Sequence, residues 1–167
     1  MKGQSEIIVF ILLFLIGFIL FSSSVLWSRG IFQRNVDIGK INAAENFMKN
    51  LDEKIKNIIS FGGSESIDYT LDSNIELLNE NTIEIKLPVT IDLPRKWVNI
   101  SSDVSIIREI LEENILRIQL TYPEKDFAVE FFTEGPTLAK PDKIKIEKRS
   151  VYSKDNISVI RIEITFQ

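Results

Sequence analysis

Residues 7–21 read IIVFILLFLIGFILF, and no charged residue occurs between Ile7 and Ser28. At ~1.5 Å per residue, a helix of this length spans about 30 Å, the thickness of the hydrocarbon layer of a membrane. Trp27 falls at the far end, where an interfacial aromatic residue is expected. The stretch therefore predicts a transmembrane helix over residues 4–28.

A buried core helix and a cleaved secretory signal are the alternatives for this stretch. A core helix rarely runs so far without a polar stripe. A secretory signal needs a basic start, an apolar run of about 7–15 residues and a small-residue cleavage site. Residues 22–24 are all serine and supply small residues for cleavage, but the length of the run favours a retained helix.

The residues directly before the apolar run are Lys2, Gly3, Gln4, Ser5 and Glu6. This order, set against a membrane-length helix, resembles the class III signal peptides of archaeal type IV pilin-like proteins, over roughly residues 1–30. The resemblance implies that a prepilin-type signal peptidase removes the leader, residues 1–3, by cutting between Gly3 and Gln4. It also implies that the apolar helix is kept, first as a membrane anchor and then as the core of a filament.

The resemblance gives two groups of residues a role in that filament. Ser5 and Glu6 are expected at the helix start and in the registration of subunits. The family pattern spaces these residues as Gln-x-Ser-x-Glu, whereas Gln4, Ser5 and Glu6 are adjacent here. Local physics also suits both, since Ser5 is a fair N-cap and a carboxylate in the first turn gains about 0.3–1 kcal/mol from the helix dipole. The membrane and polymerisation helix comprises Ile7, Phe10, Leu13, Phe14, Gly17, Phe18, Phe21 and Trp27.

The charges that flank the helix give conflicting indications of its orientation. Arg29, Arg34 and Lys40 follow the helix and only Lys2 precedes it, which favours a cytoplasmic C-terminal side. The family resemblance implies the reverse. Because large domains translocate largely regardless of flanking charge, we expect a single-pass protein of the cell membrane with a cytoplasmic N-terminus and an extracellular C-terminal domain.

An amphipathic helical extension is predicted over residues 29–61. One apolar stripe recurs at steps of three and four, whereas the opposite face is rich in Asn, Lys and Glu. Gly62 is suited to end the helix in the left-handed conformation. One long helix, and a membrane helix joined to a separate core helix near Gly30 or Gly39, remain equal alternatives. The stripe consists of Ile41, Ala44, Met48, Leu51, Ile55 and Ile58.

Residues 66–167 are predicted to form an extracellular β-rich domain, because the hydrophobic period changes to two. The clearest strand covers residues 82–93, where Pro88 indicates an edge position or a bend. Hairpins are expected around residues 79–81 and 153–156. One short helix is expected where Val104, Ile107, Ile110 and Leu111 share a helical face behind Ser102 or Asp103. The predicted fold class is α+β, with a mostly antiparallel sandwich or rolled sheet.

Composition narrows the function classes. The net charge is −4 with no long basic run, which argues against a nucleic-acid-binding protein. The chain has no Cys and no His, and no cofactor-binding motif occurs, so we expect no enzyme, no cofactor and no metal site. Asn99 and Asn156 begin Asn-x-Ser patterns, which predict N-glycosylation if the domain is outside the cell.

Two functions follow from this sequence. The first is a structural subunit, a major or minor pilin-like protein, of an archaeal type IV-like surface filament. Its expected partners are membrane lipid before assembly and then copies of itself or other pilin-like subunits. The second is a single-pass membrane-anchored binding module, or an accessory protein of a surface or motility apparatus.

Overall fold

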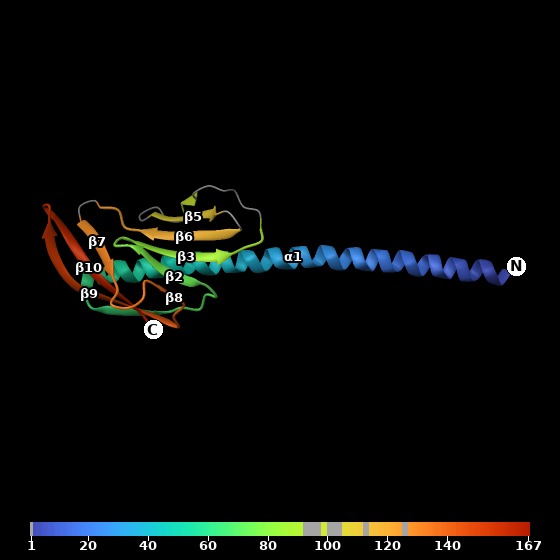
Figure 1. Cartoon of the computed structure of the whole chain (residues 1–167), viewed down its shortest axis with the longest axis horizontal. Coiled ribbons are helices and arrows are strands. Elements are labelled where there is room, and N and C mark those ends of the chain that lie inside the picture. Colours follow the sequence, from blue (N-terminus) through green and yellow to red (C-terminus); the bar gives the residue numbers. More distant parts are fainter. Residues whose placement is uncertain (1, 92–97, 100–104, 112–113, 125–126) are drawn as a thin grey trace. The chain divides into compact units, whose positions relative to one another are not determined.

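The structure is a computed structural model that describes residues 2–91, 98–99, 105–111, 114–124 and 127–167. The chain forms two compact units, Met1–Ile38 and Gly39–Gln167. A long N-terminal helix and two β-sheets make up the described structure (Figure 1). This confirms the predicted α+β class.

One helix, α1, runs from Lys2 to Phe61. Gly30 and Gly39 do not end it, so of the two alternatives the single long helix is the one observed. The helix ends at Gly62 and Gly63, whose φ angles are +76° and +86°, a region that residues with a Cβ rarely adopt. The Gly62 N–H donates to the Ile58 carbonyl over 2.8 Å, which closes the last turn.

The predicted apolar stripe of the extension is buried in the second unit. Met48, Leu51 and Ile55 are fully buried, and Phe47 beside the stripe is 8% exposed. The Phe47 ring meets the Tyr69 ring edge-on with 5.0 Å between centroids. The part of α1 from Ile41 onward is therefore a core helix of the β domain, as its helical periodicity indicated.

The strands form two sheets. The four-stranded sheet has the order β1-β9-β10-β7 and the six-stranded sheet the order β4-β5-β6-β3-β2-β8. All the strand pairs described are antiparallel except β10 with β7, which confirms a mostly antiparallel domain. The strand bounds are β1 Ser64–Asp68, β2 Asn74–Asn79, β3 Thr82–Pro88, β4 Val98–Asn99, β5 Ser105–Leu111, β6 Ile115–Thr121, β7 Phe127–Phe132, β8 Leu138–Ala139, β9 Lys143–Lys154 and β10 Ile157–Phe166.

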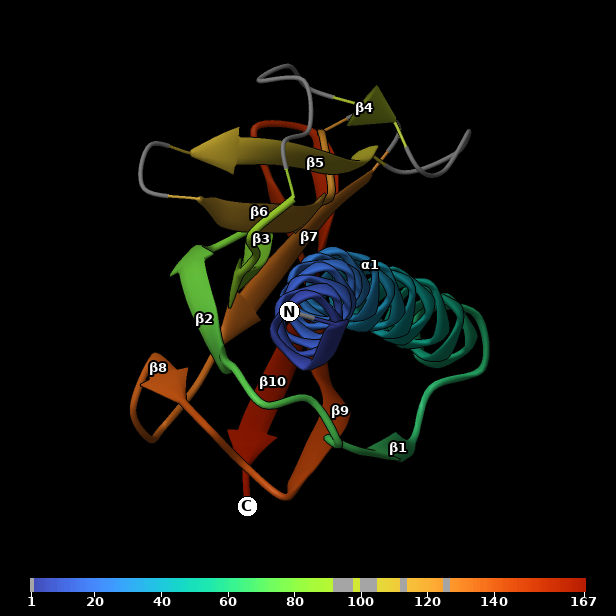
Figure 2. The same ribbon diagram turned by 90° about the vertical axis from the view of Figure 1, so that its right-hand side faces the viewer.

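Both sheets share one hydrophobic core with α1. In Figure 2 the strands lie around the part of the helix that belongs to the second unit. Ile85 and Ile118 of the larger sheet, Ile146 and Ile162 of the smaller sheet, and Leu51 of α1 are all in this core. The buried apolar residues of both sheets therefore pack against the helix as well as against each other.

Two hairpins match the sequence prediction. β2 and β3 pair across the turn at residues 79–81, and β9 and β10 pair across Asp155 and Asn156. Asp155 and Asn156 have φ angles of +52° and +64°, as a tight two-residue turn between twisted strands requires. β6 and β7, although consecutive, lie in different sheets, because β7 pairs in parallel with β10.

The predicted short helix is wrong in the part that the structure describes. Residues 105–111 form β5, which pairs with β6 so that Ile106 lies opposite Leu120. Ile106 is fully buried, whereas Ile107 is only partly covered, which is the alternation of a strand. The spacing of the apolar residues is compatible with a helix as well as with a strand, but the pairing with β6 selects the strand. Ser102, Asp103 and Val104 lie outside the described residues.

Of the two alternatives for Pro88, an edge position or a bend, the edge position is wrong. β3 lies inside its sheet, between β2 and β6. The pairing with β2 ends at Lys86, whereas the pairing with β6 continues to Pro88. Pro88 is the last residue of β3 and lies beyond its pairing with β2, so its missing N–H removes no bond to β2.

Candidate functional site

The apolar side chains at the start of α1 are all open to the surroundings. Each apolar residue from Ile7 to Phe21 is at least 46% exposed, and Trp27 is 73% exposed. This group contains the predicted membrane and polymerisation residues Ile7, Phe10, Leu13, Phe14, Phe18 and Phe21. In water, each leucine-sized side chain left exposed costs roughly 1.5–3 kcal/mol. The segment therefore requires an apolar environment from outside the chain.

In an apolar environment a polar side chain needs a hydrogen-bond partner, and Ser24 finds one within its own helix. The Ser24 hydroxyl donates to the Leu20 carbonyl over 2.9 Å, one turn earlier. A serine bonded in this way exposes no free donor to lipid. A Cβ placed at Gly17 would meet no atom within 4 Å, so Gly17 is open on the helix surface.

The predicted processing residues lie within the first turns of α1. Gly3, Gln4, Ser5 and Glu6 follow Lys2, where the helix begins. In the uncut chain, helical residues precede Ser5. The N-cap role of Ser5 stays a prediction for a chain cut between Gly3 and Gln4.

The helix and the domain that follows it indicate a class of protein. Among the described residues, one helix near the N-terminus, within Ile7–Phe61, is long and apolar enough to cross a membrane. It is followed by a β-rich domain. The arrangement is compatible with a single-pass, membrane-anchored protein.

Polar contacts fasten the second half of α1 to the β domain. The Arg108 guanidinium of β5 donates to the Glu45 carboxylate, and both side chains are partly buried. The Lys148 ammonium of β9 donates to the Ile59 carbonyl over 2.9 Å, which satisfies a carbonyl in the last turn. These contacts tie the helix to strands of both sheets.

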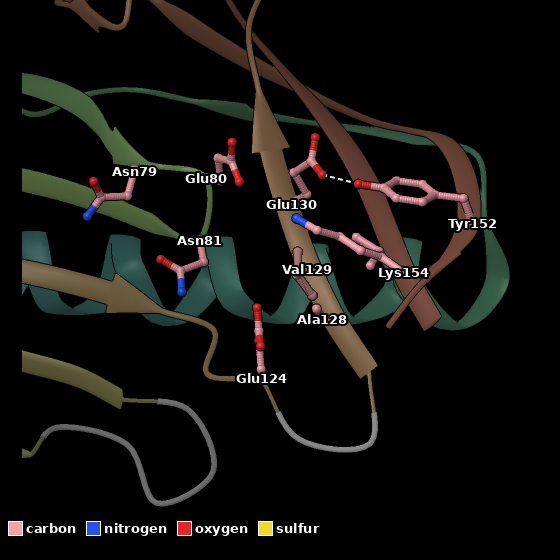
Figure 3. A pocket seen from close by; sticks show the side chains of 10 residues that line it. Asn79, Glu80, Asn81, Glu124, Ala128, Val129, Glu130, Tyr152 and Lys154 are labelled. Carbon is pink, nitrogen blue, oxygen red and sulfur yellow. Dashed lines mark hydrogen bonds between the residues drawn. The ribbon is translucent and has the colours of Figure 1, made fainter. Parts of the chain in front are cut away.

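A groove of about 480 Å³ opens on one face of β7, β10 and β9 (Figure 3). Its floor is a row across the three strands, in which Ala128, Val159 and Tyr152 stand opposite one another in register. The turn between β2 and β3 forms a wall, and the Phe131 N–H fixes this turn by donating to the Glu80 carbonyl over 2.5 Å. Distant parts of the chain thus build one concave surface.

The groove carries charges of both signs. The Glu130 carboxylate lies 3.0 Å from the Arg161 guanidinium and also accepts a hydrogen bond from the Tyr152 hydroxyl. That bond, aided by burial, raises the pKa of Tyr152. Within the described part of the chain, Glu80, Glu124 and Lys154 line the groove without an ion pair of their own. Among the described residues, two carboxylates and one ammonium of the groove therefore have no ion partner.

The two predicted glycosylation residues lie at different places in the β domain. Asn99 is on β4 and is exposed. Asn156 is exposed in the turn between β9 and β10, two residues from Lys154 of the groove. The structure therefore leaves both asparagine side chains accessible.

Metal binding has no support in the geometry that is described. Within residues 2–91, 98–99, 105–111, 114–124 and 127–167, no three Asp or Glu side chains gather as a metal site requires. The carboxylates of the groove are consequently not arranged around one cation.

The comparisons with known proteins found no relative: no protein-family model, no curated protein and no solved structure matches the chain.

The sequence did not identify the groove. Its lining residues come from residues 79–81, from Glu124 and residues 128–130, and from residues 152–159. The pairing of β7 and β9 with β10, and the bond from Phe131 to Glu80, bring these distant parts of the chain together. No local motif marks them. The nearest signal was the turn at residues 79–81, which was predicted as a connection and not as a binding surface.

Proposed function

We propose that this chain is a structural subunit, a major or minor pilin-like protein, of an archaeal type IV-like surface filament. The proposal rests on the difference between the two parts of one helix, of which the first is exposed and the second packs in the β domain. Residues 7–21 of α1 expose every apolar side chain, whereas the apolar stripe of the same helix from Ile41 to Ile58 is buried in the β domain. A filament subunit needs an assembly helix that is continuous with its folded domain.

The proposed mechanism of assembly is packing. The helix is first held in the membrane, with the N-terminus in the cytoplasm and the β domain outside the cell. Once the helix leaves lipid, each leucine-sized side chain would cost roughly 1.5–3 kcal/mol in water. The helices of neighbouring subunits therefore bury against one another, and membrane lipid is replaced by copies of this chain or by other pilin-like subunits.

Processing precedes assembly in this proposal. A prepilin-type signal peptidase cuts between Gly3 and Gln4, and the apolar helix stays with the mature protein. Glu6 then lies close to the new N-terminus. A carboxylate there is favourable to the helix dipole by about 0.3–1 kcal/mol, and it is placed to register one subunit against the next.

The proposal is tested by the variant Gly3→Val, expressed in the native cell. We expect an uncut precursor in the membrane fraction and no filaments among the structures sheared from the cell surface. Gly30→Val is the matched control, because a Cβ at Gly30 meets no atom within 4 Å. That variant should be trimmed like the natural chain. Trimming of Gly3→Val at the natural position, with filaments retained, would contradict the proposal.

A membrane-anchored binding module is the second candidate, and the groove on β7, β10 and β9 favours it. In this case the helix stays in lipid, and the β domain acts at the cell surface. The two functions predict that the protein is recovered in different cell fractions. A filament subunit is recovered with sheared surface structures, whereas an anchored module stays with the membrane.

A further inference from the structure

The geometry of the groove points to a ligand, and we propose that it binds a neutral saccharide. This is an activity beyond filament assembly and does not depend on it. The groove is formed by the β domain alone, and its volume of about 480 Å³ lies within the range of about 300–1,000 Å³ usual for ligand sites.

The mixed charge of the groove argues against a ligand of one sign. A cation would meet the Lys154 ammonium, and an anion would meet the carboxylates of Glu80 and Glu124. Glu130 adds no net charge, since the Arg161 guanidinium lies 3.0 Å away. A neutral ligand avoids both repulsions.

The hydrogen-bonding groups suit a ligand that is dense in hydroxyls. The carboxylates of Glu80 and Glu124 only accept hydrogen bonds, and the Lys154 ammonium only donates them. The Asn79 side-chain amide does both. A sugar hydroxyl both donates and accepts, so it can pair with the acceptors as well as with the donors that line the groove.

The floor of the groove suits the C–H face of a sugar ring. Ala128 and Val159 are small and apolar, at 8% and 5% exposed, and they stand in register with Tyr152. The hydrogen bond to Glu130 holds the Tyr152 hydroxyl and so orients its ring at the edge of this floor. An apolar floor with polar walls is the usual make-up of a small-ligand site.

The test uses the full chain in lipid nanodiscs that contain no glycolipid and no sugar-based detergent, because either would compete. The probes are neutral oligomers of hexoses and of N-acetylhexosamines, with a polyuronate and an oligolysine as charged counterparts. We expect at least one neutral oligomer to bind with a Kd below about 1 mM, more tightly than either charged probe.

Substitutions inside and outside the groove test whether the oligomer binds there. Glu80→Gln and Lys154→Met should each weaken the neutral oligomer about tenfold or more, because each removes a charged hydrogen-bonding group from the site. Glu134→Gln and Lys49→Met are the matched controls on exposed residues outside the groove and should leave the affinity unchanged.

Three results would overturn the proposal. The first is binding of no neutral oligomer. The second is tighter binding of polyuronate or oligolysine than of every neutral oligomer. The third is an affinity of Glu80→Gln and Lys154→Met equal to that of the two controls, with all four variants folded by circular dichroism.

Discussion

The Tyr122 hydroxyl, directly after β6, donates a hydrogen bond to the Asp52 carboxylate of α1. Tyr122 is 6% exposed and Asp52 5%, so the bond lies at the boundary between the core helix and the larger sheet. The Lys56 ammonium, one turn along the helix, lies 2.9 Å from the same carboxylate. The hydrogen bond from Tyr122 therefore offsets part of the cost of burying the charged Asp52 carboxylate.

Replacing Tyr122 with Phe leaves the Asp52 carboxylate without its buried donor. We expect a loss of about 1–3 kcal/mol in the free energy of unfolding, measured by urea denaturation of the full chain in micelles. Tyr152→Phe is the matched control, because it removes an exposed bond to Glu130. Its effect should be clearly smaller. Equal effects of the two substitutions would contradict the role given to the buried bond.

Tyr122 also predicts a pH dependence. Burial, and then the bond to Asp52, raise the pKa of Tyr122 well above its usual range, whereas in the unfolded chain it is about 10. The folded state therefore keeps the proton that the unfolded state loses. The contribution is complete below about pH 10 and is lost as the pH rises further, by up to about 1.4 kcal/mol per pH unit. Tyr122→Phe should show a shallower decline above pH 10, and an identical decline would contradict this.

Two leucines of α1 should respond differently to truncation. Leu51 is fully buried, so Leu51→Ala should reduce the free energy of unfolding by about 2–5 kcal/mol in micelles. Leu26 is 69% exposed and lies in the predicted membrane segment. Leu26→Ala should leave the unfolding of the β domain unchanged. A comparable loss in both variants would show that the buried and exposed parts of α1 are not distinct.

Membrane insertion should tolerate one charge in α1 but not two. The apolar side chains between Ile7 and Phe21 favour insertion by about 4–8 kcal/mol in total. Each Ile→Arg change near the centre opposes insertion by about 3–4 kcal/mol, which is the cost of the Arg plus the lost contribution of the Ile. Ile16→Arg alone should remain in the carbonate-washed membrane pellet. The double variant with Ile19→Arg should move to the supernatant. Retention of the double variant would contradict a membrane role for this segment.

The local patterns were sufficient to predict most elements. The stripe from Ile41 to Ile58 has only one periodicity, and the buried face of α1 follows it. Apolar and polar residues alternate in sequence over residues 83–87 of β3 and 160–166 of β10, and their hairpins have recognisable turn residues. Such elements depend on neighbours in the sequence, so a single sequence predicts them well.

The errors arose where distant residues decide the structure. Apolar residues 107, 110 and 111 fit a helix, and only the pairing of Ile106 with Leu120 in β6 selects a strand. The groove depends on β7 joining β10 in parallel across a long stretch of chain. Neither of these outcomes has a local signal.

The central claim is that the apolar helix is retained for filament assembly after removal of residues 1–3. It is tested most directly by N-terminal sequencing, with intact mass, of the mature protein from native membranes and surface fractions. We expect a mature chain that begins at Gln4 in both fractions. A mature chain that still begins at Met1 or Lys2, or one cut after the apolar run near Ser22–Ser24, would contradict it.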